Sequence, residues 1–286
     1  MKRTLIEADE LFAELANPQW AVIDCRFDLA KPAWGRAAWA QGHIPGALYA
    51  DLDQDLSGAR GPGTGRHPLP APQALAATFS RWGIDDKVQV IAYDQAGGMY
   101  AARLWWLLRW LGHDSVAVLN GGLAAWERRG LPLASQAAVR PARAFVARVH
   151  PGMTASTGQV AAALKAGALA SGAVLLVDAR GADRFAGQNE TLDPVAGHVP
   201  GARNHPFAGN QGADGRFLDA AQLRSRWQAT LAGGSAAAVV AMCGSGVTAC
   251  HNLLALEVAG LPGARLYGGS WSEWITDPER PVARGR

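Results

Sequence analysis

Cysteine is scarce in this chain of 286 residues, which contains only three. An odd and small number in a chain of this length argues against a disulfide framework and is typical of a reducing compartment. The cysteines and the seven histidines show no pair with the spacing of a zinc site. We therefore expect a cytoplasmic protein that needs neither a metal nor another cofactor.

Long apolar runs and clusters of one charge are also missing. No segment approaches the ~18 apolar residues that a membrane helix needs. The basic residues at the N-terminus are followed by acids, where a signal peptide requires an apolar stretch. The net charge is only +3, and the lysines and arginines form no run or basic helix. These absences predict that neither a membrane nor a nucleic acid is a partner.

Four sequence motifs occur twice in the same order, and this repetition defines the organisation of the chain. The paired copies lie at residues 22–26 and 176–180, 42–47 and 197–202, 90–94 and 239–243, and, allowing a one-residue shift, 119–126 and 267–274. The length also favours about two domains. We expect one domain over residues 1–135, a linker over 136–150 and a second domain over 151–286, because the stretch 133–152 is rich in Ala, Arg and Pro and lacks a clear period.

Within each copy, short apolar runs alternate with longer helical patterns. Unbroken runs of valine, isoleucine, leucine and alanine are typical of strands covered on both faces, hence of a parallel α/β sheet with helices on both sides. The pattern predicts strands near residues 20–24, 88–93, 116–119, 174–178, 238–242 and 264–267. It predicts helices near residues 71–82, 99–111, 122–129, 156–170, 220–231 and 247–259.

The run Met-Cys-Gly-Ser-Gly-Val-Thr-Ala-Cys at residues 242–250 carries the strongest signal for chemistry. Cys243 follows a predicted strand and therefore stands at the carboxyl edge of a parallel sheet, where α/β folds bind ligands. Two glycines and a predicted helix come next, so that backbone N–H groups and a helix N-terminus can converge on the sulfur. Such a loop holds an anion and favours the nucleophilic thiolate over the thiol.

Two other interpretations of Cys243 have less support. A lone cysteine is often a buried core residue, but a core cysteine does not need Gly-x-Gly after it at a strand-to-helix turn. A cysteine phosphatase also cradles an anion, but it needs an arginine at the end of the loop to clamp phosphate, and Thr248 and Ala249 stand there. Cys25, in a predicted strand, and Cys250, in a predicted helix, are expected to be core residues.

The first copy carries Asp94 where the second carries Cys243. A carboxylate cannot act as a sulfur nucleophile, so we expect one active half and one catalytically silent half. Residues present in both halves are expected to be structural. They are His43 and His198 in turns, Trp126 and Trp274 in packing, and Arg26 and Arg180, which tie a strand to a loop.

Together these motifs resemble a known family. Asp-x-Arg, Gly-His-Ile/Val-Pro-Gly-Ala, a cysteine loop and Gly-Ser-Trp-Ser-Glu-Trp, duplicated with Asp for Cys in the first copy, are similar to the two-domain rhodanese sulfurtransferases over residues 5–282. The loop Cys-Gly-Ser-Gly-Val-Thr at 243–248 resembles the 3-mercaptopyruvate branch, whereas thiosulfate-using rhodaneses carry Cys-Arg-Lys-Gly-Val-Thr. Because this loop lacks those two cations, we expect a singly charged carboxylate donor rather than dianionic thiosulfate.

The resemblance implies a mechanism and a set of site residues. Cys243 takes the sulfane sulfur of 3-mercaptopyruvate as a persulfide, pyruvate leaves, and the sulfur passes to cyanide or to a thiol acceptor such as thioredoxin. The implied catalytic residues are Cys243 and a proton relay of Ser245, His67 and Asp53. The implied substrate-binding residues are Arg184, Gly244, Gly246, Val247 and Thr248. A thiosulfate:cyanide sulfurtransferase and a non-catalytic persulfide relay protein are the alternatives.

One departure from the family concerns the substrate carboxylate. The family uses a second arginine before the Gly-His motif, but residues 188–195 contain no arginine here. One bidentate clamp is therefore missing from its usual place. Asn189 and Arg203 are the candidates to replace it.

Overall fold

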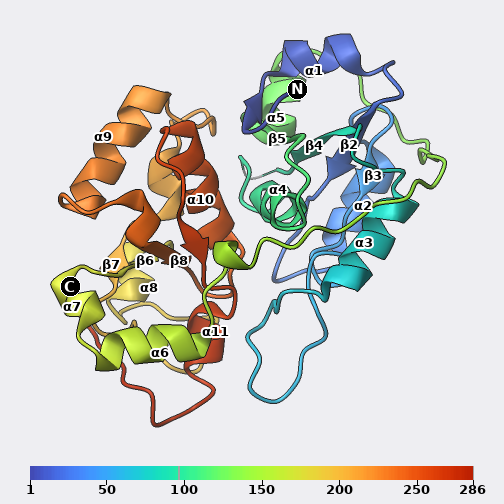
Figure 1. Ribbon diagram of the computed structural model, residues 1–286. Helices are drawn as coiled ribbons and strands as arrows, with labels where there is room; N and C mark the ends of the chain where they lie inside the picture. Colours follow the sequence, from blue (N-terminus) through green and yellow to red (C-terminus); the bar gives the residue numbers. More distant parts are fainter. Residues whose placement is uncertain (96, 286) are drawn as a thin grey trace. The chain divides into compact units, whose positions relative to one another are not determined.

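The computed structural model describes residues 1–95 and 97–285, and the chain forms two compact units (Figure 1). The first unit consists of Met1–Gly58, Pro70–His150 and Gly212–Phe217. The second consists of Ala59–Leu69, Pro151–Gln211 and Leu218–Arg286. Each unit thus includes a short segment from the other half of the sequence. Ala96, in the loop after Asp94, and Arg286, the last residue of the second predicted domain, lie outside the described residues.

The first unit contains a five-stranded parallel sheet in the order β1-β5-β4-β2-β3. Its strands are β1 (Leu5–Ile6), β2 (Trp20–Asp24), β3 (Leu48–Tyr49), β4 (Gln89–Tyr93) and β5 (Val116–Leu119). Its helices are α1 (Ala8–Glu14), α2 (Trp34–Gln41), α3 (Pro72–Arg81), α4 (Ala101–Trp110) and α5 (Gly122–Arg128). The three strands and three helices predicted for the first copy are confirmed, with small differences at their ends.

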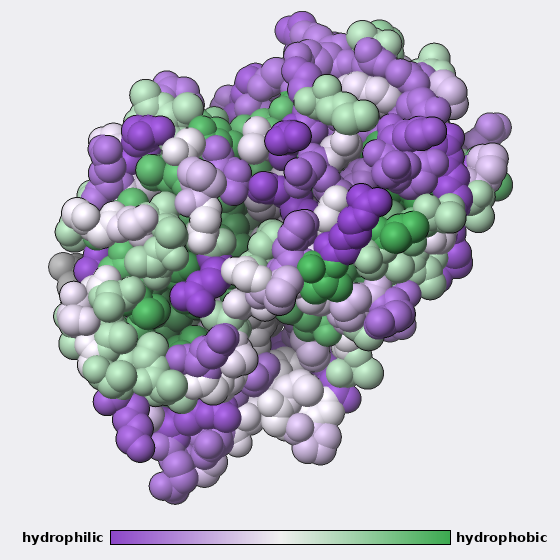
Figure 2. Space-filling view, in the orientation of Figure 1, coloured by the Kyte–Doolittle hydropathy of each residue, from purple (hydrophilic) through white to green (hydrophobic). Residues whose placement is uncertain are grey.

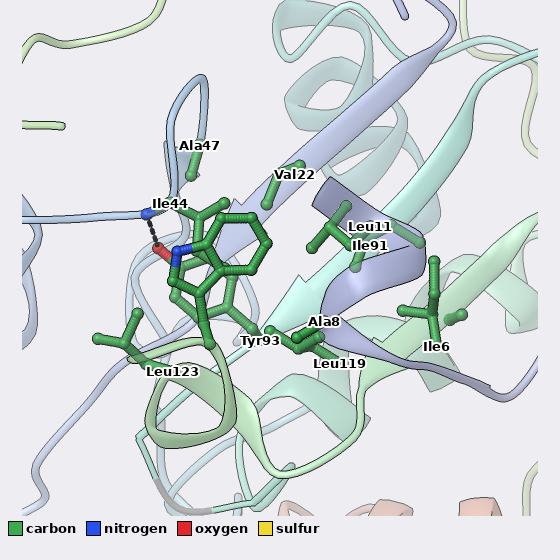
Figure 3. Close-up of a cluster of buried hydrophobic side chains, with 12 residues drawn as sticks. Ile6, Ala8, Leu11, Val22, Ile44, Ala47, Ile91, Tyr93, Leu119 and Leu123 are labelled. Atoms are coloured by element: carbon green, nitrogen blue, oxygen red, sulfur yellow. Dashed lines mark hydrogen bonds between the residues drawn. The ribbon is translucent and has the colours of Figure 1, made fainter. Parts of the chain in front are cut away.

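Helices cover both faces of this sheet. On one face, α1 and α5 pack on the strands through a buried cluster that includes Leu11, Ile91 and Leu123 (Figure 3). The Tyr93 hydroxyl fixes this cluster to the loop before β3, because it accepts a 3.2 Å hydrogen bond from the backbone N–H of Ile44. Alternate strand residues such as Val90 point to the opposite face, where α4 packs, and they are equally buried. The continuous apolar strands therefore reflect burial on two sides.

The second unit contains a four-stranded parallel sheet in the order β7-β6-β8-β9. Its strands are β6 (Leu175–Asp178), β7 (Arg203–Asn204), β8 (Val239–Met242) and β9 (Arg265–Leu266). Its α-helices are α6 (Thr157–Lys165), α7 (Ala168–Ser171), α8 (Ala182–Phe185), α9 (Ala220–Leu231), α10 (Thr248–Val258) and α11 (Ser270–Trp274). Short 3₁₀ turns are η1 (Pro151–Met153), η2 (Phe207–Asn210) and η3 (Ala236–Ala238).

The second sheet is also covered on both faces, which confirms the predicted fold class. Figure 1 shows α9 and α10 on one side of β6 and β8, and α6, α7 and α11 on the other. One prediction was wrong in detail, because the single helix expected over residues 156–170 is two helices. Gly167 lies between α6 and α7 with a left-handed φ of 72°, a conformation that ends a helix.

Equivalent hydrogen bonds relate the two units. The backbone N–H of Leu123 donates to Asp94 O (2.9 Å), as that of Trp271 donates to Cys243 O (3.0 Å). The indole N–H groups of Trp126 and Trp274 donate to a proline carbonyl at 2.9 and 3.0 Å, respectively. Residues 119–126 and 267–274 therefore correspond without the one-residue shift that the sequence comparison allowed.

The structural roles expected for the repeated Asp-x-Arg and Gly-His motifs are confirmed. Arg26 binds Asp24 through two nitrogens and donates to Gly42 O at 2.7 Å. Arg180 repeats this arrangement with Asp178 and Gly197 O at 2.8 Å. Nδ1 of His43 lies 2.7 Å from Trp39 O, and Nδ1 of His198 lies 2.8 Å from Phe185 O, so both imidazoles brace a turn.

Residues 136–150, expected to be a linker, pack along the first unit. The backbone N–H groups of Arg143 and Arg148 donate to Ser80 O (3.0 Å) and Leu111 O (2.9 Å). On the face that Figure 2 shows, hydrophilic and apolar residues are interspersed. Among the residues that the structure describes, no helix is both long and apolar enough to cross a membrane.

Candidate active site around Cys243

Cys243 lies directly after β8, at the carboxyl edge of the second sheet. Its side chain is 2% exposed, and the backbone N–H of Gly246 donates to its Sγ at 3.1 Å. The backbone N–H of Cys243 donates to Ser270 Oγ at 3.0 Å, which fixes the start of the loop. Helix α10 follows, with Val247 as its N-cap and Thr248 as its first residue. The sulfur therefore accepts a backbone N–H in the loop that leads into the N-terminus of α10, a type of arrangement that binds anions.

Gly246 makes this tight loop possible. Its φ is +80°, in the left-handed region that disfavours a side chain. A Cβ atom at this position would also collide with the carbonyl oxygen of Gly268. Only glycine places the residue 246 N–H against the sulfur without strain.

Ser245 meets His67 in the same unit. Nδ1 of His67 lies 2.7 Å from Ser245 Oγ, and the two residues are 1% and 6% exposed. The segment that carries His67 is held on α11, because the backbone N–H of Arg66 donates to Ser272 Oγ at 3.0 Å. Of the predicted relay, the structure thus brings the serine and the histidine together.

Asp53, the third member of the predicted relay, belongs to the first unit. It lies in a turn after β3, where its backbone N–H donates to Asp51 Oδ1 at 2.9 Å. Its role beside His67 stays a prediction.

Two guanidinium groups stand over Gly244. A Cβ atom on this glycine would lie 2.7 Å from Arg66 Nη2 and 3.6 Å from Arg184 Nη2. Glycine therefore leaves room for two cations to approach the residue next to Cys243. Arg184 was expected here from the sequence, and Arg66 was not.

Two buried carboxylates hold these arginines. Glu190 accepts hydrogen bonds from Arg184 Nε (3.1 Å) and Nη2 (2.8 Å), and Asp193 bridges Arg184 and Arg66. Burial would raise the pKa of Glu190, but the hydrogen bonds and charge of Arg184, together with the N–H groups of Leu192 and Asp193, outweigh burial and lower that pKa below its usual value. Burial raises the pKa of Asp193, and the opposing attraction of Arg66 does not cancel the effect.

The two residues considered as substitutes for the missing arginine lie elsewhere. Asn189 Nδ2 donates to the exposed Asp183 at 3.0 Å. Arg203 Nη1 donates to Thr230 O (2.7 Å) and Leu231 O (2.9 Å) at the end of α9. Both side chains are thus engaged with other groups, and the second cation beside Gly244 in the structure is Arg66.

Comparison with known proteins agrees with this geometry. The family model of the rhodanese-like domain matches residues 7–129 and again residues 159–277. The chain belongs to the rhodanese-like family. Two matches in tandem make it a two-domain member, and similar relatives place it in the 3-mercaptopyruvate sulfurtransferase branch.

Three relatives illustrate the similarity. The chain is 49% identical over 284 residues to a probable 3-mercaptopyruvate sulfurtransferase of Pseudomonas aeruginosa, covering 98% of each chain. It is 40% identical over 286 residues to a putative thiosulfate sulfurtransferase, SseB, of Mycobacterium tuberculosis, covering 99% of this chain and 98% of that protein. It resembles the solved structure of a 3-mercaptopyruvate sulfurtransferase from Leishmania major with a TM-score of 0.85 and 30% identity, covering 98% of this chain and 75% of that one.

The first rhodanese-like unit fills its equivalent loop with its own anion. Oδ1 of Asp94 accepts a hydrogen bond from the N–H of Gly98 (2.9 Å), and Oδ2 accepts from those of Tyr100 (2.6 Å) and Ala101 (2.8 Å). The backbone N–H groups of this loop thus bind a carboxylate in the first unit, whereas in the second unit the N–H of Gly246 binds the Cys243 sulfur.

Sequence reasoning missed several residues of this rhodanese-family site. They are Arg66, Glu190, Asp193, Ser270 and Ser272. A weak signal existed for the first three, since Arg66 precedes His67 and the two acids occupy the stretch where an arginine was expected. Cys25 and Cys250 are buried, as expected for core residues. Within the described part of the chain, no three His, Cys, Asp or Glu side chains gather in a way that could hold a metal ion.

Proposed function

We propose that this rhodanese-family sulfurtransferase takes its sulfur from 3-mercaptopyruvate, carries it as a persulfide on Cys243 and passes it to a thiol or to cyanide. The observation that carries the proposal is the pairing of a buried cysteine in an anion-cradling loop with two guanidinium groups beside the next residue. The relatives named as 3-mercaptopyruvate sulfurtransferases support the choice of donor.

In the first half-reaction, the Cys243 thiolate attacks the sulfur of the donor. An S–S bond forms, the C–S bond breaks, and its electron pair leaves on the methylene carbon as the enolate of pyruvate. Arg184 and Arg66 bind the donor carboxylate, and the loop N–H groups, represented by Gly246 N–H, stabilise the sulfur anion.

The enolate must gain a proton before it leaves as pyruvate, and the donor thiol must lose one. Ser245 and His67 supply this path, because a hydroxyl and an imidazole 2.7 Å apart can pass a proton between them. Asp53 would orient the imidazole as the third member of the relay.

In the second half-reaction, an acceptor thiolate attacks the outer sulfur of the persulfide. The acceptor becomes the persulfide and Cys243 returns as thiolate, so no external oxidant or reductant is consumed. A protein thiol such as thioredoxin would serve as acceptor. The three free cysteines fit a reducing cytoplasm, where such thiols are kept reduced.

Parallel assays of pyruvate release from 3-mercaptopyruvate and of thiocyanate formation from thiosulfate and cyanide test this proposal. We expect turnover of both donors to require Cys243 and 3-mercaptopyruvate to have the higher kcat/KM. Faster turnover of thiosulfate would reverse the choice of donor. No turnover of either donor by the wild-type protein, combined with a persulfide on Cys243 in the purified protein, would instead favour the relay protein.

Thiosulfate remains the second candidate donor on one specific observation. The loop lacks the two cations of thiosulfate-using rhodaneses, yet Arg66 and Arg184 bring two cations to the same place from other segments. The relative named as a putative thiosulfate sulfurtransferase is consistent with this alternative.

A further inference from the structure

Donor choice depends on the net charge at Gly244, and the two arginines do not stand there alone. Asp193 accepts from Arg66 Nη1 and, at 3.2 Å, from Arg184 Nη2, so one carboxylate is shared by both cations. Its side chain is 2% exposed, whereas those of Arg66 and Arg184 are 25% and 20% exposed. The acid is therefore buried behind guanidinium groups that can still reach a ligand.

The segment before the Gly-His motif thus supplies a negative charge at this site, where a second arginine was expected. Glu190 faces Arg184 and also lies 3.4 Å from Arg180, which is already paired with Asp178. It belongs to the framework of the loop, because its carboxylate also accepts the N–H groups of Leu192 (2.9 Å) and Asp193 (3.1 Å). Asp193 is the acid that joins the two cations beside the nucleophile.

We propose that Asp193 determines donor selectivity by reducing the positive charge that Arg66 and Arg184 present at Gly244, so that the site accepts a singly charged donor and disfavours a dianion. The inference rests on the proposed function and deepens it. It also assigns Arg66 as the second cation of the donor site.

The physical reason is the charge dependence of Coulomb's law. Each unit of charge added to the cluster attracts a dianion twice as strongly as a monoanion at the same distance. The partly buried position reduces screening by solvent ions. Removing the negative charge of Asp193 therefore strengthens the binding of thiosulfate more than the binding of 3-mercaptopyruvate.

A purely structural role for Asp193 would give the opposite result. If the carboxylate only held Arg66 in place, its loss would have the same effect as the loss of Arg66. The kcat/KM for both donors would then fall. The two explanations thus differ in the sign of the effect, which a pair of variants can measure.

The experiment compares kcat/KM for both donors in Asp193→Asn, Arg66→Gln and the double variant, with Asp183→Asn as the matched control. Asn keeps an acceptor oxygen for the arginines in the first variant and for the α8 N–H of Arg184 in the control. Asp183 is exposed and its side chain pairs with Asn189, so the control removes the same charge from the same unit at an exposed position that does not bridge the two arginines.

We expect Asp193→Asn to raise the ratio of thiosulfate to 3-mercaptopyruvate kcat/KM about tenfold, and Arg66→Gln to lower it. The double variant restores the charge of the cluster, so its ratio should return towards that of the wild type. Asp183→Asn should leave the ratio unchanged. A ratio that falls in Asp193→Asn, or that moves equally in the control, would overturn the proposal.

A binding measurement separates this inference from the proposed function. Calorimetric titration of Cys243→Ser protein with sulfate, a dianion, and with pyruvate, a monoanion, requires no turnover. Adding Asp193→Asn to that protein should lower the Kd for sulfate by a larger factor than the Kd for pyruvate. If the wild type turns over neither donor but Asp193→Asn still favours sulfate, the proposed reaction is wrong and the proposed role of Asp193 stands. If both donors react but Asp193→Asn does not favour sulfate over pyruvate, only the proposed role of Asp193 is wrong.

Discussion

At the scale of single residues, a side chain's function depends on its partners in space. Arg184 and Cys243 could be predicted because their motifs in the sequence carry enough information. Arg66 was missed, since it reaches Gly244 from a segment far away in the sequence and its place before His67 is only a weak signal of that approach. In the sequence, Glu190 and Asp193 have the pattern of ordinary loop acids, because their burial against arginines depends on the fold.

Ser245 and His67 give a prediction at this scale. Changing Ser245→Ala removes the hydroxyl that lies 2.7 Å from the imidazole, so the proton path to the donor thiol and the enolate is lost. We expect kcat/KM for 3-mercaptopyruvate to fall about 10- to 1,000-fold, and that for thiosulfate, which needs no such proton, to fall less.

Steady-state kinetics with both donors provide the measurement, and His67→Gln should show the same pattern. A uniform loss with both donors would mean that the pair supports the loop but moves no proton.

At the scale of elements, patterns that span several turns or a whole buried strand could be predicted. The strand before Cys243 and the helix after it are examples, because a continuous apolar run and a helical period both lie within one segment. Strand β1 has two residues and α8 has four, which is too short for any period to appear. Their positions depend on tertiary contacts rather than on local pattern.

The loop after β8 gives a prediction at this scale. Gly246→Ala should destabilise the protein by about 2–4 kcal/mol, because the left-handed φ and the collision with Gly268 O both oppose a Cβ atom. Gly130→Ala is the matched control, since Gly130 has φ +65° but nothing near its Cβ position. Urea unfolding of both variants isolates the collision. Equal losses would show that φ alone accounts for the effect.

The loop after β4 in the first unit, which contains Asp94, gives a second prediction at this scale. Asp94→Ala leaves three buried N–H groups without the carboxylate that they bind, and we expect a loss of about 2–4 kcal/mol of stability. Asp94→Asn keeps one acceptor oxygen and should lose about half as much. Denaturant unfolding measures both. A variant Asp94→Ala as stable as the wild type would contradict the role of the carboxylate as the resident anion of this loop.

At the scale of the whole molecule, the duplication could be predicted, but the exchange of segments between units could not. Ala59–Leu69 belongs to the second unit and Gly212–Phe217 to the first. Hydrogen bonds between residues far apart in the sequence hold these two segments in place. Examples are those from Arg66 N–H to Ser272 Oγ and from Phe217 N–H to Asn120 Oδ1. No repeat or periodicity in the sequence records such pairings.

The pH dependence of stability gives a prediction at this scale. Burial lowers the pKa of His205 and of His113 below the ordinary value of 6.5. Below pH 6.5 the unfolded chain therefore binds protons that the folded chain does not. Stability should be full above that pH and fall as the pH decreases, by at most about 1.4 kcal/mol per pH unit for each histidine.

Urea unfolding across this range checks the slope, which His205→Gln should flatten. The same substitution at the exposed His150 serves as the matched control. A slope that is the same in wild type and His205→Gln would show that His205 does not contribute.

The mass of the protein after one exposure to 3-mercaptopyruvate, with no acceptor present, tests the central claim most directly. We expect the chain to gain one sulfur atom, located on Cys243 by peptide mapping, with one pyruvate released per chain. Cys243→Ser protein should gain no sulfur and release no pyruvate. An unchanged mass of the wild type, or a sulfur located on Cys25 or Cys250, would contradict the account.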